Sequence, residues 1–64
     1  MSRLQDRRKA MGLSQSKLAE KSGVNVRMIQ HCERGYRDIN RTAVITVKRL
    51  ADALGCKIED LIEG

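Results

Sequence analysis

The chain has 64 residues, of which 41% are apolar and 33% charged, so it predicts one small globular domain over residues 1–64 and excludes a two-domain enzyme and a disordered chain. It has no Phe, no Trp and a single Tyr, so we expect an aliphatic core, which favours helices over sheets. Lys and Arg outnumber Asp and Glu by 13 to 8, and the whole excess lies before residue 42, which favours an anionic partner. Nucleic acid fits better than a membrane, because no segment is a basic amphipathic helix with bulky apolar anchors. The alternative is a merely basic surface.

The first three predicted helices span residues 2–11, 14–22 and 25–34. Each starts with a residue whose side chain can accept a hydrogen bond from the first turn, namely Ser2, Ser14 and Asn25. A glycine directly follows each of these segments, as expected of helix C-caps in a chain without proline: Gly12, Gly23 and Gly35.

Two further helices are predicted, over residues 42–54 and 58–62. The longer one contains several β-branched residues, but its apolar positions recur with a period of about 3.6, which predicts a helix. The shorter one has three apolar side chains available for burial: Ile58, Leu61 and Ile62.

Residues 15–32 carry the pattern of a helix-turn-helix. Two helices joined by a short turn pack at a steep angle only if the contact is small and the turn admits a left-handed residue. Ala19 supplies the small contact, and Gly23 supplies the left-handed residue. The other positions of the pattern are inward-facing: Leu18, Val24, Ile29 and Cys32.

Several short motifs extend this pattern over nearly the whole chain. They are Arg8, Gly12-Leu13-Ser14-Gln15, Leu18-Ala19-Glu20-Lys21, Gly23-Val24, Ile29, Glu33-Arg34-Gly35, Leu50-Ala51, Ala53-Leu54-Gly55 and Glu59-Asp60-Leu61-Ile62. Together they resemble the Cro/C1-type (xenobiotic-response-element) family of helix-turn-helix repressors. The resemblance implies a compact, all-α, five-helix, lambda-repressor-like domain whose third helix lies in the DNA major groove, usually as a dimer on a near-palindromic operator. The stretch between Gly35 and Leu50 is longer than is usual in the family, and it lacks the proline that commonly follows Glu-Arg-Gly.

The resemblance also implies which residues meet DNA bases. The matching positions on the third helix are Val26, Arg27, Met28, Gln30 and His31. Arg27 suits guanine and Gln30 suits adenine, because these side chains present matching donors and acceptors, while Val26 or Met28 would touch a thymine methyl. A phosphate contact or plain solvent exposure is the alternative for Arg27, and His31 is expected to be an exposed polar residue rather than a pH switch.

Phosphate contacts are expected at two places. Ser14 and Gln15 stand at the start of the second helix, where free N–H groups and the helix dipole attract anions, although Ser14 also suits the cap of its own helix. The remaining candidates follow the third helix: Arg34, Tyr36, Arg37 and Arg41. The alternative for this second group is an ordinary solvated loop.

Glu33 is out of place on a basic surface. Its match to the family signature suggests an inward ion pair with Arg8, which would hold the first and third helices in register.

Other chemistries find little support in the sequence. Cys32, Cys56 and the single histidine, His31, cannot complete a four-ligand metal site, so we expect no metal and no cofactor. His31 and Cys32 are adjacent and would diverge by about 100° on a helix, so they form no catalytic dyad and no enzyme is expected. No apolar run approaches the roughly 18 residues of a membrane span, and no leader pattern is found, so we expect a cytoplasmic protein without a membrane partner.

The sequence therefore predicts a sequence-specific, double-stranded-DNA-binding transcriptional regulator, in particular a repressor. The alternative is an antitoxin or co-regulator whose main partner is another protein. A homodimer is expected, because one small head reads too few base pairs to select a site, and it is either stable in solution or formed only on DNA. The dimer interface is expected around Ile58, Leu61 and Ile62, although two of these residues could instead pack into the core.

Overall fold

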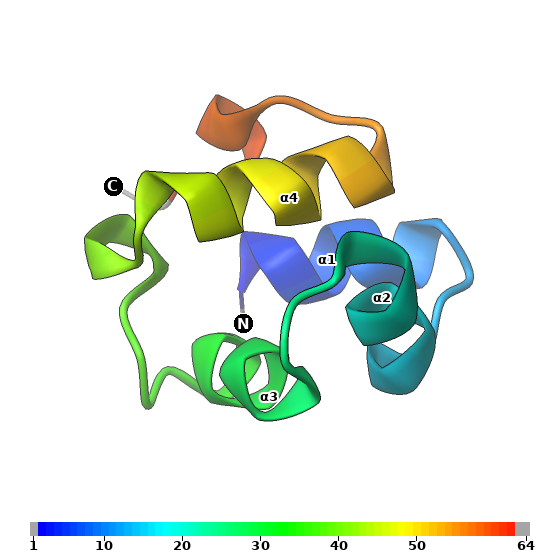
Figure 1. Cartoon of the computed structure of the whole chain (residues 1–64), viewed down its shortest axis with the longest axis horizontal. Coiled ribbons are helices and arrows are strands. Elements are labelled where there is room, and N and C mark those ends of the chain that lie inside the picture. Colours follow the sequence, from blue (N-terminus) through cyan, green and yellow to red (C-terminus); the bar gives the residue numbers. More distant parts are fainter. Residues whose placement is uncertain (1, 63–64) are drawn as a thin grey trace.

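The computed structural model describes residues 2–62, and this range is folded entirely from helices and turns (Figure 1). The elements are α1 (Arg3–Ala10), α2 (Gln15–Ser22), α3 (Val26–Arg34), the 3₁₀ turn η1 (Ile39–Arg41), α4 (Val44–Leu54) and the 3₁₀ turn η2 (Ile58–Asp60). In Figure 1, α4 and α3 lie on opposite sides of the molecule with α1 between them, and α2 contacts both. The predicted all-α class is confirmed.

The first three helices start after their predicted N-caps, and α2 and α3 end at their predicted glycines, whereas α1 ends at Ala10 with Met11 as its C-cap. Ser2, Ser14 and Asn25 are the N-caps, and each side chain accepts a hydrogen bond from a first-turn backbone N–H, at 3.0, 3.0 and 2.8 Å respectively. Gly23 and Gly35 follow α2 and α3 with φ of 73° and 81°, the left-handed conformation that glycine adopts without steric cost.

The connection between α3 and α4 differs from the prediction. An additional turn, η1, buries Ile39 in the core, and α4 begins at Val44 rather than at residue 42. Thr42 is buried as the cap of η1: its N–H donates to the Ile39 carbonyl at 3.1 Å, and its hydroxyl donates to the Asp38 carbonyl at 3.1 Å. These bonds hold Thr42 in an extended conformation, so the prediction that it starts α4 was wrong.

The predicted fifth helix is also wrong in detail, because residues 58–60 form a single 3₁₀ turn. The Lys57 N–H donates to the Asp60 carboxylate at 3.0 Å, and the Leu61 N–H donates to the Ile58 carbonyl at 2.9 Å. Leu61 follows in the core, with none of its surface exposed, and the Ile62 N–H donates to the Ile58 carbonyl at 3.1 Å.

The core is aliphatic, as predicted, and receives side chains from every α-helix and from the segments that follow α2, α3 and α4. Its buried members are Leu4, Leu18, Val24, Ile29, Cys32, Ile39, Val47, Leu50, Ala51, Ala53, Leu54 and Leu61. Every buried side-chain nitrogen or oxygen of the described residues has a hydrogen-bond partner. This packing fixes α3 with one face inward and the other toward solvent.

Candidate nucleic-acid interface

The turn between α2 and α3 has the geometry that the sequence pattern predicts. Gly23 takes the left-handed conformation, and Val24 directs its side chain into the core with 8% exposed. The Val24 N–H donates to the Ser22 hydroxyl at 3.2 Å, which satisfies a backbone donor of the turn. This contact of Ser22 was not predicted, although a serine two residues before the N–H of a turn is a recognisable local signal.

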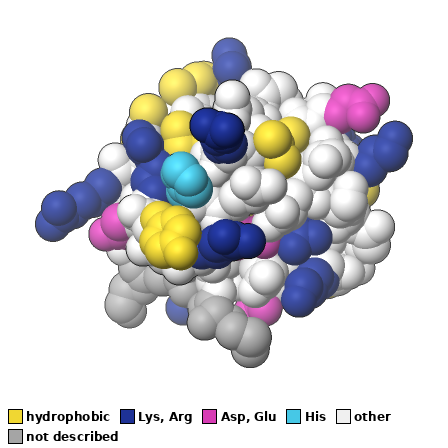
Figure 2. Space-filling model, turned by 90° about the horizontal axis from the view of Figure 1, so that it is seen from below, with side chains coloured by type: hydrophobic (Ala, Val, Ile, Leu, Met, Phe, Trp, Pro, Cys, Tyr) yellow, Lys and Arg dark blue, Asp and Glu magenta, His cyan; other side chains and the backbone are white. Residues whose placement is uncertain are grey.

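The outward face of α3 is polar and positively charged. Arg27, His31 and Arg34 are exposed, and their spacing of four and three residues puts them along one face of the helix. Ile29 and Cys32 lie on the opposite, buried face. Figure 2, which views the molecule from below relative to Figure 1, shows Lys and Arg side chains on several sides of the histidine.

The other three residues expected at bases lie on the flanks of this face. Val26 and Gln30 are half-buried, and so is Met28, which packs against the core. Of the five residues predicted to meet bases, the exposed face of α3 therefore contains two, Arg27 and His31.

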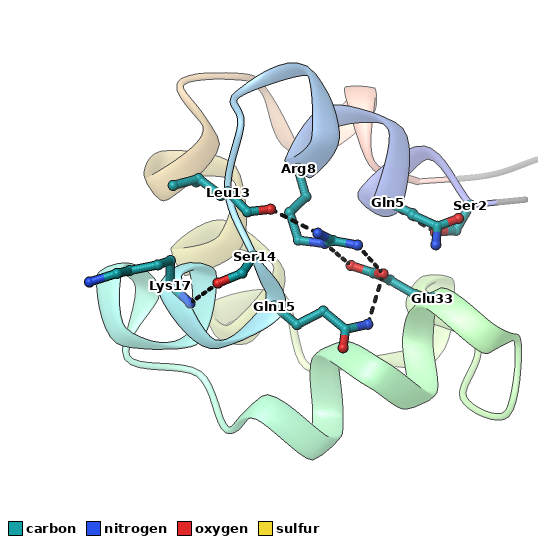
Figure 3. A network of polar contacts seen from close by, with 8 residues as sticks. All are labelled: Ser2, Gln5, Arg8, Leu13, Ser14, Gln15, Lys17 and Glu33. Carbon is teal, nitrogen blue, oxygen red and sulfur yellow. Dashed lines mark hydrogen bonds and ion pairs between the residues drawn. The ribbon is translucent and has the colours of Figure 1, made fainter.

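A network of polar contacts lies between α1, α2 and α3 (Figure 3). The Arg8 guanidinium donates to both oxygens of the Glu33 carboxylate, from Nε to Oε2 at 2.7 Å and from Nη2 to Oε1 at 3.0 Å. Nη1 of Arg8 also donates to the Leu13 carbonyl at 2.8 Å. The side chains of Arg8 and Glu33 are only 10% and 1% exposed. The hydrogen bond to Glu33 raises the pKa of Arg8 above its ordinary value, against the opposing effect of burial, so the guanidinium stays charged.

Ser14 and Gln15 occupy the start of α2, but their side chains are already engaged. The Ser14 hydroxyl accepts from the Lys17 N–H at 3.0 Å, and the Gln15 amide nitrogen donates to Glu33 Oε1 at 3.1 Å. The backbone N–H groups of Gln15 and Ser16 precede the helical ladder, so they have no acceptor within it. The contact of Gln15 with Glu33 was not predicted, because no sequence pattern relates two side chains 18 residues apart.

The four candidates at the end of α3 and after it are all exposed: Arg34, Tyr36, Arg37 and Arg41. The backbone N–H groups of Tyr36 and Arg37 both donate to the His31 carbonyl, at 2.9 and 3.2 Å, which fixes the path of this segment against the end of α3. The Tyr36 ring, 74% exposed, packs edge-on against the His31 ring with 5.9 Å between centroids. Arg41 lies 3.9 Å from the Asp38 carboxylate, so its charge is partly offset.

Comparison with known proteins gives one decisive result: a family model described as helix-turn-helix matches residues 4–61. The chain belongs to the Cro/C1-type helix-turn-helix family. The matched span contains α2, α3, α4 and both 3₁₀ turns, and all of α1 except Arg3. Searches of curated proteins and of solved structures gave no match. As a Cro/C1-type protein, the chain is a DNA-binding helix-turn-helix regulator.

Two further features are absent from the described residues. None of their helices is long and apolar enough to cross a membrane. No group of three or more His, Cys, Asp or Glu side chains in residues 2–62 is placed to hold a metal ion. His31 is exposed whereas Cys32 is buried, so the two side chains do not face one another.

Proposed function

We propose that this Cro/C1-type protein is a sequence-specific repressor that inserts α3 into the major groove of double-stranded DNA. The observation that carries the proposal is the exposed face of α3, where Arg27, His31 and Arg34 project from a helix whose other face is locked into the core. A helix fits the major groove of B-DNA, and only there do all four base pairs present distinct donor and acceptor patterns. Occupying an operator excludes other proteins from it, so repression needs no further chemistry.

The residues divide into base readers and phosphate binders. Arg27 donates two hydrogen bonds to a guanine, and Gln30, on the flank of the exposed face, pairs with an adenine. His31 contacts the bases beside Arg27. Val26 and Met28 are half-buried, so their part in recognition is an apolar contact with a thymine methyl. The phosphate binders are Ser14, Gln15, Arg34, Tyr36, Arg37 and Arg41. Because the Ser14 hydroxyl caps α2, Ser14 contributes its place at the helix N-terminus more than a free side chain.

The active species is a homodimer on a near-palindromic operator, and we place its formation on DNA. Of the apolar residues that the sequence offered for a dimer surface, Leu61 is fully buried and Ile58 is half-buried against the core. Of these three residues only Ile62 is exposed, at 38%, and one isoleucine offers far less apolar surface than the about 800 Å² per partner of a stable interface. Two heads on half-sites about 34 Å apart would meet only when DNA aligns them.

Selection from a randomised duplex pool at near-physiological salt tests this function. The wild type should enrich a two-fold-symmetric motif, and Arg27→Ala should lose the preference for guanine at one position of each half-site, at a cost of about 1–3 kcal/mol. Enrichment of a motif without symmetry would refute the dimer. No enriched motif, with weak binding that fades steeply as salt rises, would refute specific recognition and favour the alternative of a protein partner.

A further inference from the structure

Gln15 enters the Arg8–Glu33 ion pair from the start of α2. Its amide nitrogen lies 3.1 Å from Glu33 Oε1, the same oxygen that accepts from Arg8 Nη2 at 3.0 Å (Figure 3). An ionised carboxylate can only accept hydrogen bonds, so the amide must turn its nitrogen and not its oxygen toward Glu33. Glu33 thus fixes the orientation of the Gln15 amide.

The fixed orientation determines what Gln15 offers to a partner. An amide nitrogen carries two hydrogens, and one of them is used on Glu33. The side chain makes no other hydrogen bond within residues 2–62, and Figure 3 shows its oxygen turned away from the Glu33 carboxylate. Gln15 is half-buried, so part of its side chain faces solvent at the start of α2, where the first backbone N–H groups have no acceptor within the helix.

Arg8 makes this arrangement compatible with a polyanion. A bare carboxylate beneath the start of α2 would repel phosphate, but the Arg8 guanidinium contacts both Glu33 oxygens and offsets the charge. The third donor of Arg8 holds the Leu13 carbonyl at 2.8 Å, two residues before Gln15. The network therefore fixes both the backbone that leads into α2 and the amide at its first position.

We propose that Glu33 is a positioning residue for DNA binding, and that it orients the Gln15 amide so that its second N–H donates to a DNA phosphate at the start of α2. This role rests on the proposed function, because it requires DNA against α3. It adds to the structural role of the Arg8–Glu33 pair, which requires no DNA.

A double-mutant cycle on DNA affinity tests the role. Dissociation constants for a duplex carrying the selected motif are measured for the wild type, Gln15→Met, Glu33→Asp and the double variant. Circular dichroism identifies a temperature at which all four are folded. Asp preserves the charge opposite Arg8 but withdraws the carboxylate from Gln15 by one methylene. Each single variant should bind about tenfold more weakly, as expected for a hydrogen bond to a charged group, and the double variant no more weakly than either.

Gln5→Met is the matched control, because Gln5 is equally half-buried but lies on α1 outside the proposed surface. It should bind DNA like the wild type. If Glu33→Asp does not fold, Gln15→Asn replaces it, since its amide is too short to reach Glu33 and should bind as weakly as Gln15→Met. Wild-type affinity of Gln15→Asn would overturn the role.

Two results of the cycle would also overturn it. Additive losses would mean that Glu33 does not act through Gln15, and a Glu33→Asp variant with a lower melting temperature but unchanged affinity would make the pair purely structural. In both cases the wild type still binds, so the proposed function survives. A wild type that binds no duplex specifically would overturn the proposed function and this role together.

Discussion

The guanidinium of Arg8 on α1 donates two hydrogen bonds, of 2.7 and 3.0 Å, to the carboxylate of Glu33 on α3, which lies 25 residues later in the sequence. The neighbouring Arg7 forms a longer ion pair, with 3.7 Å between its Nη2 and Asp60 Oδ1, and its side chain is 50% exposed. Removing one partner of a buried pair leaves the other charge unpaired and costs about 3–5 kcal/mol, whereas an exposed pair contributes about 1 kcal/mol or less. The two adjacent arginines should therefore differ sharply in their contribution to stability.

Arg8→Ala should lower the free energy of unfolding by about 3 kcal/mol, and Arg7→Ala by less than about 1 kcal/mol. Urea titrations followed by circular dichroism at 222 nm measure both values. Equal midpoints for the two variants would show that the Arg8–Glu33 pair does not hold α1 and α3 together.

Most of the fold was predictable from local sequence signals, whereas contacts between distant segments were not predictable. The N-caps Ser2, Ser14 and Asn25 were found from sequence because a cap depends on residues two or three positions away. Thr42 was misassigned because its hydroxyl and N–H are satisfied by η1, a turn with no periodic signal. The approach of Gln15 to Glu33 depends on how α2 packs against α3, which only the folded structure specifies.

The candidate site was predictable to a similar extent. The family resemblance put Arg27 and His31 at DNA-facing positions of the third helix, and both are exposed to solvent in the structure. The same reasoning did not foresee that Met28 packs against the core, because position on a helix does not specify which neighbours cover a flank. The pairing of Arg8 with Glu33 came from the family resemblance, since spacing alone does not relate residues on different helices.

Arg37 should contribute to DNA affinity through charge alone. It is exposed after α3, beside the proposed groove. Arg37→Ala should weaken binding to specific and nonspecific duplexes by the same factor, and should reduce the slope of log affinity against log salt by about 0.9, the value for one phosphate contact. Fluorescence anisotropy at several salt concentrations measures the slope.

Arg49→Ala is the control for this prediction, because it removes the same charge from α4, on the opposite side of the molecule from α3 in Figure 1. Its slope should remain close to that of the wild type. Equal slopes for Arg37→Ala and Arg49→Ala would indicate attraction by net charge rather than a phosphate contact at Arg37.

Gly23 should be required because its backbone is in the left-handed conformation, and not because a larger side chain lacks space. A Cβ added there would meet nothing within 4 Å, but the φ of 73° is costly for residues with a side chain. Gly23→Ala should therefore lower the free energy of unfolding by about 1–2 kcal/mol, and Gly23→Asn by less, since Asn tolerates this conformation. Thermal unfolding of the two variants checks the order, and a neutral Gly23→Ala would contradict the assigned cause.

The two thiols should differ in reactivity. Cys32 on α3 is 5% exposed, whereas Cys56 is half-buried after α4, and burial is the main cause that raises the pKa of each thiol above its ordinary value. Alkylation proceeds through the thiolate, so both should react more slowly in the folded protein than in urea, with Cys56 modified before Cys32. Mass spectrometry of digests after timed iodoacetamide treatment measures the order, and faster labelling of Cys32 would contradict its burial.

The raised pKa of Cys32 also predicts how stability depends on pH. The folded protein keeps the thiol proton to a higher pH than the unfolded chain, whose thiol has the ordinary value of 9.0. The corresponding stabilisation is complete below that value and is lost as pH rises through the folded pKa. The urea midpoint of the wild type should therefore fall above pH 9.0, and it should fall less in Cys32→Ala, which has no thiol to ionise there. Parallel pH profiles for the two proteins would show that other groups account for the loss.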